Sequence, residues 1–176
     1  MPDHAQPSTA FISVGSNIEP ERNIRAALDL LRSRAEVVRS STFYRTEPLG
    51  RPDQPKFVNG VWQIRTSLEP LRVPEELLRP IEQALGRRRT EDKFAPRTLD
   101  LDLVLYDAVV YDKGGMRLPH PDLGRPFVYV PVCELLEGGD PELAERIRAL
   151  LPKDAGALCP GEALAELTEQ LRHMLA

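Results

Sequence analysis

The amino-acid sequence predicts an α+β fold: a ferredoxin-like βαββαβ sheet with helices on one face, followed by a small hairpin and a C-terminal helical extension. Short β-rich segments and segments with helical spacing occur in the order β, α, β, β, α, β, which is the order of that fold. A length of 176 residues suits one domain with a single core. No apolar run approaches the roughly 20 residues that a membrane span needs.

The first four elements are a strand, a helix and two further strands. Segment 9–15, TAFISVG, is β-rich and leads into Gly-Ser-Asn, a turn signal. Pro20 suits a first helical turn, and apolar residues recur at helical spacing as far as Leu31. Segments 37–44 and 57–66 are rich in β-branched and aromatic residues, and the segment between them is crowded with proline and glycine. The pattern predicts two strands joined by a long loop.

A second helix and the clearest strand follow. Segment 75–85 has its large apolar residues on one face, Gly86 is placed as a C-terminal cap, and Pro80 predicts a kink or a late start. Segment 98–106, TLDLDLVLY, alternates strictly between leucine and other residues. We therefore expect the leucine face to pack into the core and the acidic face to lie outside it. That acidic face carries Asp100, Asp102, Val104 and Tyr106.

The rest of the chain is predicted to form a hairpin and a helical tail. Segments 109–111 and 116–118, separated by Asp-Lys-Gly-Gly, indicate the hairpin. Apolar residues at helical spacing near the C-terminus indicate two further helices. We expect a flexible leader at 1–8, a main domain at 9–136, and a helical extension at 137–176 that packs on the same domain.

Charge and cysteine content exclude several classes of protein. The formal net charge of -4 disfavours a nucleic-acid-binding surface, which is normally basic. Cys133 and Cys159 lie far apart and outside any CxxC pattern, so neither a disulfide framework nor a zinc site is indicated. The N-terminal residues lack the apolar core of a secretion signal. We expect a cytoplasmic monomer with no membrane or nucleic-acid partner.

Two acidic residues and a basic segment give the strongest functional signal. Asp100 and Asp102 leave the same face of their strand about 7 Å apart at the backbone, so they could supply oxygen ligands to a pair of Mg²⁺ ions. A solvated strand face with two surface acids is the alternative. Segment 87–97 carries five basic and two acidic residues, and its arginines could bind phosphate oxygens.

Signals for a nucleotide site of a known kind are missing from the sequence. It contains neither GxxxxGK[ST] nor GxGxxG, so an ATP site must be built in another way. His120 lies in a Leu-Pro-His-Pro turn that could direct its ring towards the carboxylates. A structural histidine is the alternative there.

Six segments occur in an order and at spacings typical of one family. They are FISVGSN, FYRTEPLG, FVNGVWQI, IEQALGRRR, FAPRTLDLDLVLYD and LPHPDL. Together, from about Thr9 to Leu136, they resemble the 6-hydroxymethyl-7,8-dihydropterin pyrophosphokinase family. The resemblance implies a ferredoxin-like fold and an enzyme of folate biosynthesis, which transfers diphosphate from Mg-ATP to the hydroxymethyl group of the pterin and releases AMP.

The resemblance implies that Asp100 and Asp102 bridge two Mg²⁺ ions. It further implies that Arg87 and Arg97 contact the phosphates and help catalysis. Arg79 replaces a glutamine that is common in relatives, and the stretch from His120 to Arg125 is one residue shorter than usual. The implied ATP-binding residues are Glu82, Arg89, Arg97, His120 and Arg125.

For the pterin, the resemblance implies a pocket in which Asn59 bonds the ring and Phe57 and Phe127 stack on its two faces. Core aromatic residues are the alternative for both phenylalanines. Phe94 takes the place of a tryptophan that is common in relatives. The implied pterin-binding residues are Thr46, Leu49, Phe57, Asn59, Phe94 and Phe127.

Two other classes of function compete with this interpretation. A two-metal phosphodiesterase or nuclease can also use an Asp-x-Asp pair, and it would act without pterin. A ferredoxin-like binding or regulatory module could use segment 87–97 to contact RNA or a small effector. The predicted strands lack the aromatic and basic signature of RNA-binding sheets, and the chain is acidic, which argues against RNA.

Overall fold

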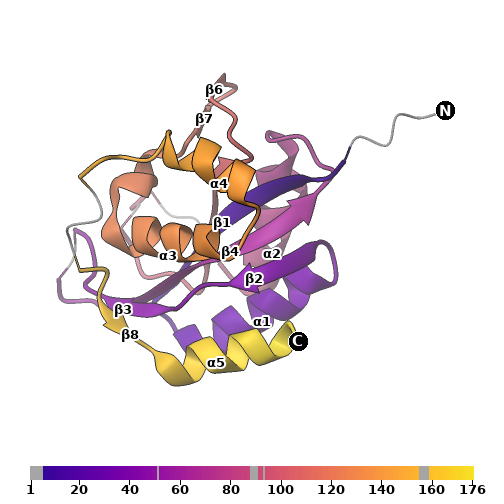
Figure 1. Cartoon of the computed structure of the whole chain (residues 1–176). Helices are drawn as coiled ribbons and strands as arrows, with labels where there is room; N and C mark the ends of the chain where they lie inside the picture. The colour runs from indigo at the N-terminus through magenta and orange to yellow at the C-terminus, as the bar shows by residue number, and fades with distance from the viewer. Residues whose placement is uncertain (1–5, 51, 88–90, 93, 155–158) are drawn as a thin grey trace.

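The chain forms a six-stranded antiparallel sheet with helices on both faces (Figure 1). The computed structural model describes residues 6–50, 52–87, 91–92, 94–154 and 159–176. The strands lie in the order β5-β1-β4-β3-β8; β3 pairs with the first part of β4 and β2 with its last part. Their bounds are β1 Ser8–Ser16, β2 Glu36–Ser40, β3 Tyr44–Thr46, β4 Phe57–Thr66, β5 Asp100–Tyr106 and β8 Glu162–Ala163.

The helices cover the two faces of the sheet in separate layers. One layer contains α1 (Pro20–Arg32), the π-helical η1 (Val73–Leu78), α2 (Arg79–Ala84) and α5 (Ala165–Met174); the other contains α3 (Pro126–Glu137) and α4 (Pro141–Arg148). The predicted βαββαβ order with α1 and α2 on one face is confirmed. The later helices α3 and α4 cover the opposite face, so the sheet is enclosed on both sides.

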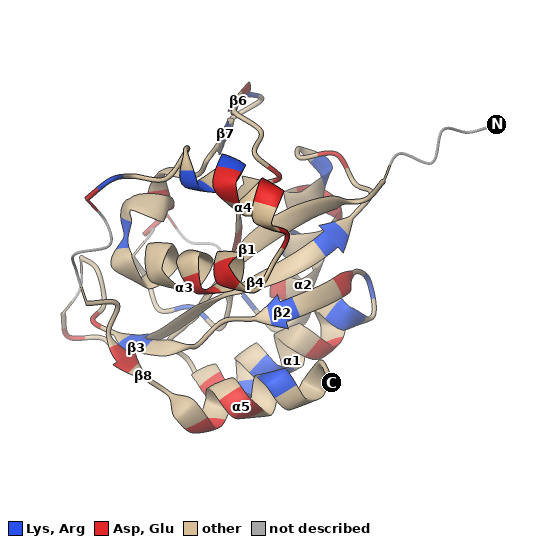
Figure 2. Ribbon diagram, in the orientation of Figure 1, with Lys and Arg blue, Asp and Glu red and all other residues tan. Residues whose placement is uncertain are grey.

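The two faces of β1 lie in different hydrophobic cores. Ile12 and Val14 belong to the core under α1, α2 and α5, whereas Phe11 belongs to the core under α3 and α4. Phe43 and Trp62, with ring centroids 6.0 Å apart, lie in the first core. Figure 2 shows that α3 is largely uncharged, whereas charged residues mark α1, α4 and α5. This distribution agrees with the position of α3 against the sheet.

The predicted strict alternation of β5 is wrong beyond Leu103, because the strand contains a bulge. Ile12 pairs with Leu103 and Phe11 with Leu105, so Val104 is the extra residue. A bulge shifts side chains to the opposite face. Leu105 therefore joins Val104 in the α3 core, and Tyr106 lies in the core with the earlier leucines.

Two predicted elements also change. The strand predicted at 37–44 is interrupted between β2 and β3, where the Ser41 Oγ accepts a hydrogen bond from the Val61 N–H at 2.9 Å and the Phe43 side chain turns into the core. The helix predicted at 75–85 begins earlier, as the π-helical η1, and continues as α2 after a change of pitch at Pro80, which lacks an N–H. Gly86, with φ of 80°, ends it as predicted.

The predicted hairpin forms with its second strand at 116–118, as predicted, but its first strand begins two residues later than predicted. It pairs β6 (Tyr111–Lys113) with β7 (Met116–Leu118), and only Gly114 and Gly115 separate the strands. Both glycines have positive φ, 64° and 78°, which is the backbone of a tight two-residue turn. Because this turn takes only two residues, Asp112 and Lys113 belong to the first strand. The predicted bounds of that strand, 109–111, are therefore two residues too early.

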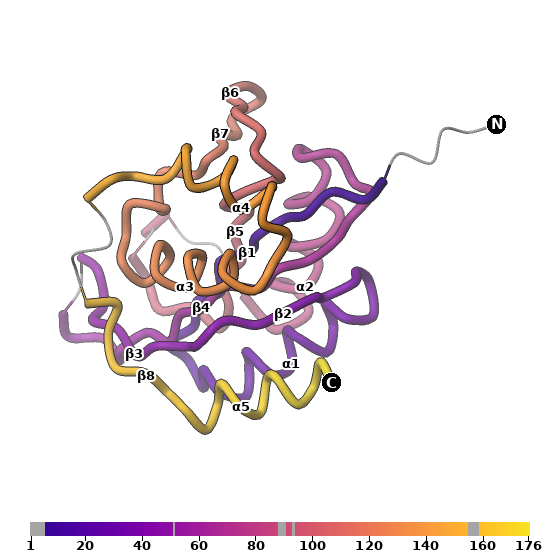
Figure 3. Tube along the Cα trace, viewed as in Figure 1, coloured from indigo at the N-terminus to yellow at the C-terminus, as the bar shows by residue number. Residues whose placement is uncertain are grey.

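The C-terminal segment returns to the first face of the sheet. In the tube of Figure 3, α5 runs beside α1, and its Leu167 and Leu171 are buried in the same core. β8 pairs with β3, and the Thr168 Oγ1 accepts a hydrogen bond from the Phe43 N–H at 3.0 Å. Of the predicted leader, residues 1–5 lie outside the described residues, and Ser8 already belongs to β1. Within the described ranges, no helix is both long and apolar enough to cross a membrane.

Candidate active site

A cleft lies at the end of the sheet where β1 ends and β4 and β5 begin. Three residues form one row across these strands, because Gly15 pairs with Asn59 on one side and with Asp100 on the other. The cleft has a volume of about 280 Å³, close to the lower end of typical small-molecule sites. Its lining residues are Thr46, Glu47, Leu49, Phe57, Asn59, Phe94, Arg97, Asp100, Asp122, Arg125 and Phe127.

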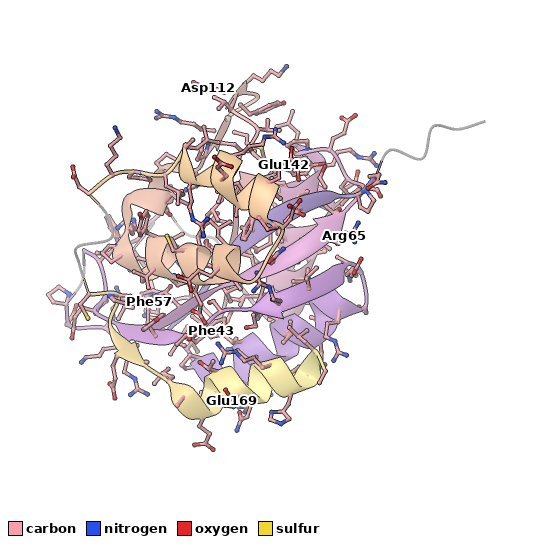
Figure 4. All side chains as sticks on the ribbon, viewed as in Figure 1. Phe43, Phe57, Arg65, Asp112, Glu142 and Glu169 are labelled. Atoms are coloured by element: carbon pink, nitrogen blue, oxygen red, sulfur yellow. The ribbon has the colours of Figure 1, made fainter. Side chains whose placement is uncertain are left out.

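The aromatic part of the cleft comes from the sheet and from α3. Phe57 and Asn59 are two positions apart on β4, so both face the same side of the sheet. Phe127 lies in the first turn of α3, the helix that covers this side. Figure 4 shows Phe57 at the β3 end of the sheet. All six residues predicted to bind pterin line this one cleft.

A hydrogen bond holds the Asn59 amide in place, and the amide has room there because residue 15 is a glycine and has no side chain. Its Nδ2 donates to the Thr46 Oγ1 at 2.7 Å, and Asn59 is only 9% exposed. A Cβ on Gly15 would lie 2.7 Å from the Asn59 Oδ1, which is closer than real Cβ contacts. Gly15 was not among the predicted site residues. Its glycine-serine-asparagine segment predicts a turn, whereas in the structure the glycine leaves room for Asn59.

Beside the aromatic part, Asp100 binds two arginines. Its Oδ1 accepts from the Arg87 Nη1 at 2.5 Å and its Oδ2 accepts from the Arg97 Nη1 at 2.6 Å. The same Arg87 nitrogen lies 2.5 Å from the Glu82 Oε2. Glu82 is 3% exposed, and its Oε2 also accepts the N–H of Leu101 at 3.1 Å. Glu82 thus connects Arg87 to the backbone of β5 and does not line the cleft.

Asp102 lies next along β5, opposite Ser13 of β1. Burial is the largest cause that raises the pKa of Asp102 to about 7, and the negative charges of Asp100, Asp122 and Glu82 contribute to the same rise, against the opposing effect of Arg87. This concentration of carboxylates favours an added cation. Among the described residues, no group of three or more histidine, cysteine, aspartate or glutamate side chains could hold a metal alone. Two carboxylates nevertheless fit Mg²⁺, which takes one or two and completes its shell with phosphates and water.

Two further residues predicted to bind ATP, His120 and Arg125, lie around a short turn before α3. His120 is the N-cap of the 3₁₀ helix η2 (Pro121–Gly124), where its Nδ1 accepts the N–H of Asp122 at 3.0 Å. Arg125 lines the cleft and donates through its Nε to the Asp122 Oδ1 at 3.0 Å. The ring of His120 borders a separate depression with Leu118 and Pro119. Arg89, also predicted to bind ATP, lies outside the described residues.

Two residues that line the cleft were not among the predicted site residues. Glu47 follows Thr46 directly, and Asp122 belongs to the LPHPDL segment. Both lie within segments that carried the resemblance, but neither had a spacing that indicated chemistry. The position of Asp122 near Asp102 depends on the packing of η2 against β5.

The fold and the cleft define an α+β protein whose site combines an aromatic pocket, a buried amide and an arginine–carboxylate cluster. The model of the family "7,8-dihydro-6-hydroxymethylpterin-pyrophosphokinase (HPPK)" matches residues 11–137. The chain belongs to this family. It is therefore a pyrophosphokinase of folate biosynthesis, as the resemblance predicted.

Individual relatives agree with the family. The chain is 41% identical over 131 residues to 2-amino-4-hydroxy-6-hydroxymethyldihydropteridine pyrophosphokinase of Haemophilus influenzae, covering 72% of this chain and 81% of that protein. It is 37% identical over 161 residues to the protein of the same name from Pseudomonas aeruginosa, covering 89% and 95%.

A solved structure shares the fold. It is titled "Crystal Structure Analysis of the HPPK-DHPS in complex with substrates", with a TM-score of 0.55, 11% identity and coverage of 94% of this chain. The chain spans 43% of that solved chain. At this identity the likeness concerns the fold alone.

Proposed function

We propose that this chain transfers the terminal diphosphate of ATP to the hydroxymethyl group of 6-hydroxymethyl-7,8-dihydropterin and releases AMP, in a reaction that depends on Mg²⁺. The observation that carries the proposal is the composition of one cleft. Phe57, Asn59 and Phe127 lie in it together with Arg97 and Asp100. A flat heterocycle and a polyphosphate would therefore lie next to each other.

The aromatic part of the cleft suits the pterin. Asn59 offers an amide, which can both donate to and accept from the edge of a pterin ring. The hydrogen bond to Thr46 and the glycine at position 15 fix that amide before the ligand arrives. Phe57 and Phe127 would stack on the two faces of the ring, an arrangement that adds to simple burial.

The arginine–carboxylate cluster suits the phosphates and the metal. Asp100 and Asp102 would hold Mg²⁺, which when bound neutralises charge on the phosphate oxygens. In this structure Arg87 and Arg97 are paired with Asp100. When Asp100 binds a cation, these two guanidinium groups are the ones that can turn to the phosphates, where planar forks fit the oxygens. Arg125, which also lines the cleft, is a further candidate.

The reaction is an in-line displacement at the β-phosphorus of ATP. The hydroxymethyl oxygen of the pterin forms a bond to the β-phosphorus, the bond between that phosphorus and the oxygen shared with the α-phosphate breaks, so that AMP leaves with this oxygen, and the hydroxyl proton is released to water. The side chains of the cleft position the two substrates, and the arginines stabilise the charge on the transferred group. Positioning and charge stabilisation supply most of the acceleration in this type of reaction.

The test is AMP release from Mg-ATP, measured with and without 6-hydroxymethyl-7,8-dihydropterin. Pterin-dependent AMP together with a diphosphorylated pterin supports the proposal. A phosphodiesterase would release nucleotide or phosphate without pterin, and a binding module would release none. Either result would refute the proposed reaction.

A further inference from the structure

Asn17, the residue that follows β1, connects two chain segments that border the cleft. It is 3% exposed. Its Nδ2 donates to the Gln54 Oε1 at 2.8 Å and to the Pro55 carbonyl at 3.2 Å. Its Oδ1 accepts the N–H of Arg97 at 2.8 Å, and its own N–H donates to the Arg97 carbonyl at 3.1 Å. The side-chain amide thus bonds both segments at once.

Gln54 extends this connection from the loop between β3 and β4 to the segment 94–99. Its Nε2 donates to the carbonyl of Phe94 at 2.8 Å. Four residues earlier, Gly50 has φ of 77°, and a Cβ there would lie 2.7 Å from the Phe94 ring. The ring of Phe94 therefore rests on the backbone of the opposite loop. We refer to Asn17 and Gln54 with these bonds as the Asn17–Gln54 bridge.

Both connected segments supply lining residues to the cleft. Leu49 comes from the β3–β4 loop, and Phe94 and Arg97 come from the segment before β5. Arg97 has two roles here, because its backbone bonds Asn17 while its side chain binds Asp100. The bridge therefore lies between the aromatic part of the cleft and the arginine–carboxylate cluster.

We propose that Asn17 is a positioning residue that couples the two substrate sites of this enzyme. The inference rests on the proposed function and adds to it a residue that touches neither substrate. Asn17 fixes the backbone of Arg97 on one side and the loop that carries Leu49 on the other. When a substrate orders one of these segments, the bonds of Asn17 therefore help to order the other segment. A purely local role, such as shaping the turn after β1, does not explain bonds to partners 37, 38 and 80 positions away.

Three substitutions separate the parts of the bridge. Asn17→Ala removes all three side-chain bonds. Asn17→Asp retains an acceptor for the Arg97 N–H but loses both donors to the β3–β4 loop, and Gln54→Glu retains an acceptor for Asn17 but loses the donor to Phe94. The matched control is Asn23→Ala, because the Asn23 Nδ2 bonds only the nearby Ile18 carbonyl, at 2.6 Å, among the contacts that the structure describes.

The informative quantity is the ratio of pterin dissociation constants without and with a non-hydrolysable ATP analogue, measured by calorimetry on the full chain with Mg²⁺. We expect the unchanged protein to show a ratio of about 5 to 150, the typical range of coupling between sites. Asn17→Ala should bring this ratio close to one and lower kcat about 100-fold, since a small misplacement near the reacting groups has that effect. Asn17→Asp and Gln54→Glu should also bring this ratio close to one, with a smaller fall in kcat.

A purely structural role would lower thermal stability and leave the ratio unchanged, so unfolding is followed for each variant. A ratio of one in the unchanged protein, or an unchanged ratio in folded Asn17→Asp and Gln54→Glu, would overturn the inference. A loss of the ratio in Asn23→Ala would overturn it as well. Should Asn17→Ala fail to fold, the two conservative variants decide. Failure of the proposed function can be distinguished from failure of this inference, because in the first case the unchanged protein would release no pterin-dependent AMP.

Discussion

Replacing Asp102 with asparagine should stabilise the metal-free protein, and the gain should grow with pH. The pKa of Asp102 is raised from 3.8 to about 7 by burial and by the neighbouring carboxylates. Between these two values the folded protein binds more protons than the unfolded chain, so its stability falls as pH rises from about 4 to about 7. Above pH 7 Asp102 is ionised in the folded protein, and the full loss of folding free energy caused by its charge is present.

The size of the effect follows from those pKa values. A difference of one pKa unit corresponds to about 1.4 kcal/mol, so the full difference would approach about 4 kcal/mol. Because Asp102 is only partly buried and water screens part of this penalty, we expect the gain at pH 8 to be on the order of 2 kcal/mol. At pH 4 the gain from removing the charge should vanish, because the carboxyl group is protonated in the folded protein.

The assay is urea unfolding in the presence of a chelator, at several values between pH 4 and pH 8.5. Asp29→Asn, at an exposed position on α1, controls for the general loss of one carboxylate. Repeating the measurement with Mg²⁺ instead of chelator should stabilise the unchanged protein more than Asp102→Asn. A difference between Asp102→Asn and the unchanged protein that does not vary with pH would refute the reasoning.

Three further predictions concern the cleft and the residues that support it. Phe57→Ala and Phe127→Ala should each weaken pterin binding by about 0.5 to 1.5 kcal/mol beyond lost burial, with ATP-analogue affinity unchanged in calorimetry; equal losses for both ligands would indicate a damaged core. Gly15→Ala should displace the Asn59 amide from Thr46 and weaken pterin binding about tenfold, while Gly124→Ala, where a Cβ meets no atom, should leave it unchanged. Glu82→Gln should lower the free energy of unfolding by about 1 to 3 kcal/mol in urea, because Arg87 and the Leu101 N–H lose a buried charged acceptor; unchanged stability would show that Asp100 compensates.

The order of the elements could be predicted because each carried a local signal. Periodicity identified α1, Gly86 marked the end of α2, and the Asp-x-Asp alternation placed Asp100 and Asp102 on one side of β5. These features depend on neighbours within a few positions along the chain. The same local rule failed at Val104, because a bulge is fixed by the register against β1 and not by the strand itself.

Much of the site depends on contacts between distant parts of the chain. The resemblance, and not periodicity, brought Phe57 and Phe127 into one pocket, since they come from two adjacent layers of the fold, the sheet and α3. Nothing in the spacing of Gly15 and Asn59 indicates that they are neighbours, because their contact arises only from the pairing of β1 with β4. Asn17 likewise gave only a turn signal, and its partners lie in two separate loops.

The return of α5 to the first face has a consequence for synthesis of the protein in the cell. Arg25 of α1 donates to the Gln170 Oε1 at 2.8 Å across 145 positions, and Leu167 and Leu171 complete the core against α1. At about 5 to 20 residues per second, a ribosome needs roughly seven to thirty seconds to make the intervening chain. During that time the apolar side of α1 has no α5 to cover it. The part of the core that α5 covers therefore stays exposed in the nascent chain until α5 is made, and slow codons between α1 and α5 would lengthen this interval.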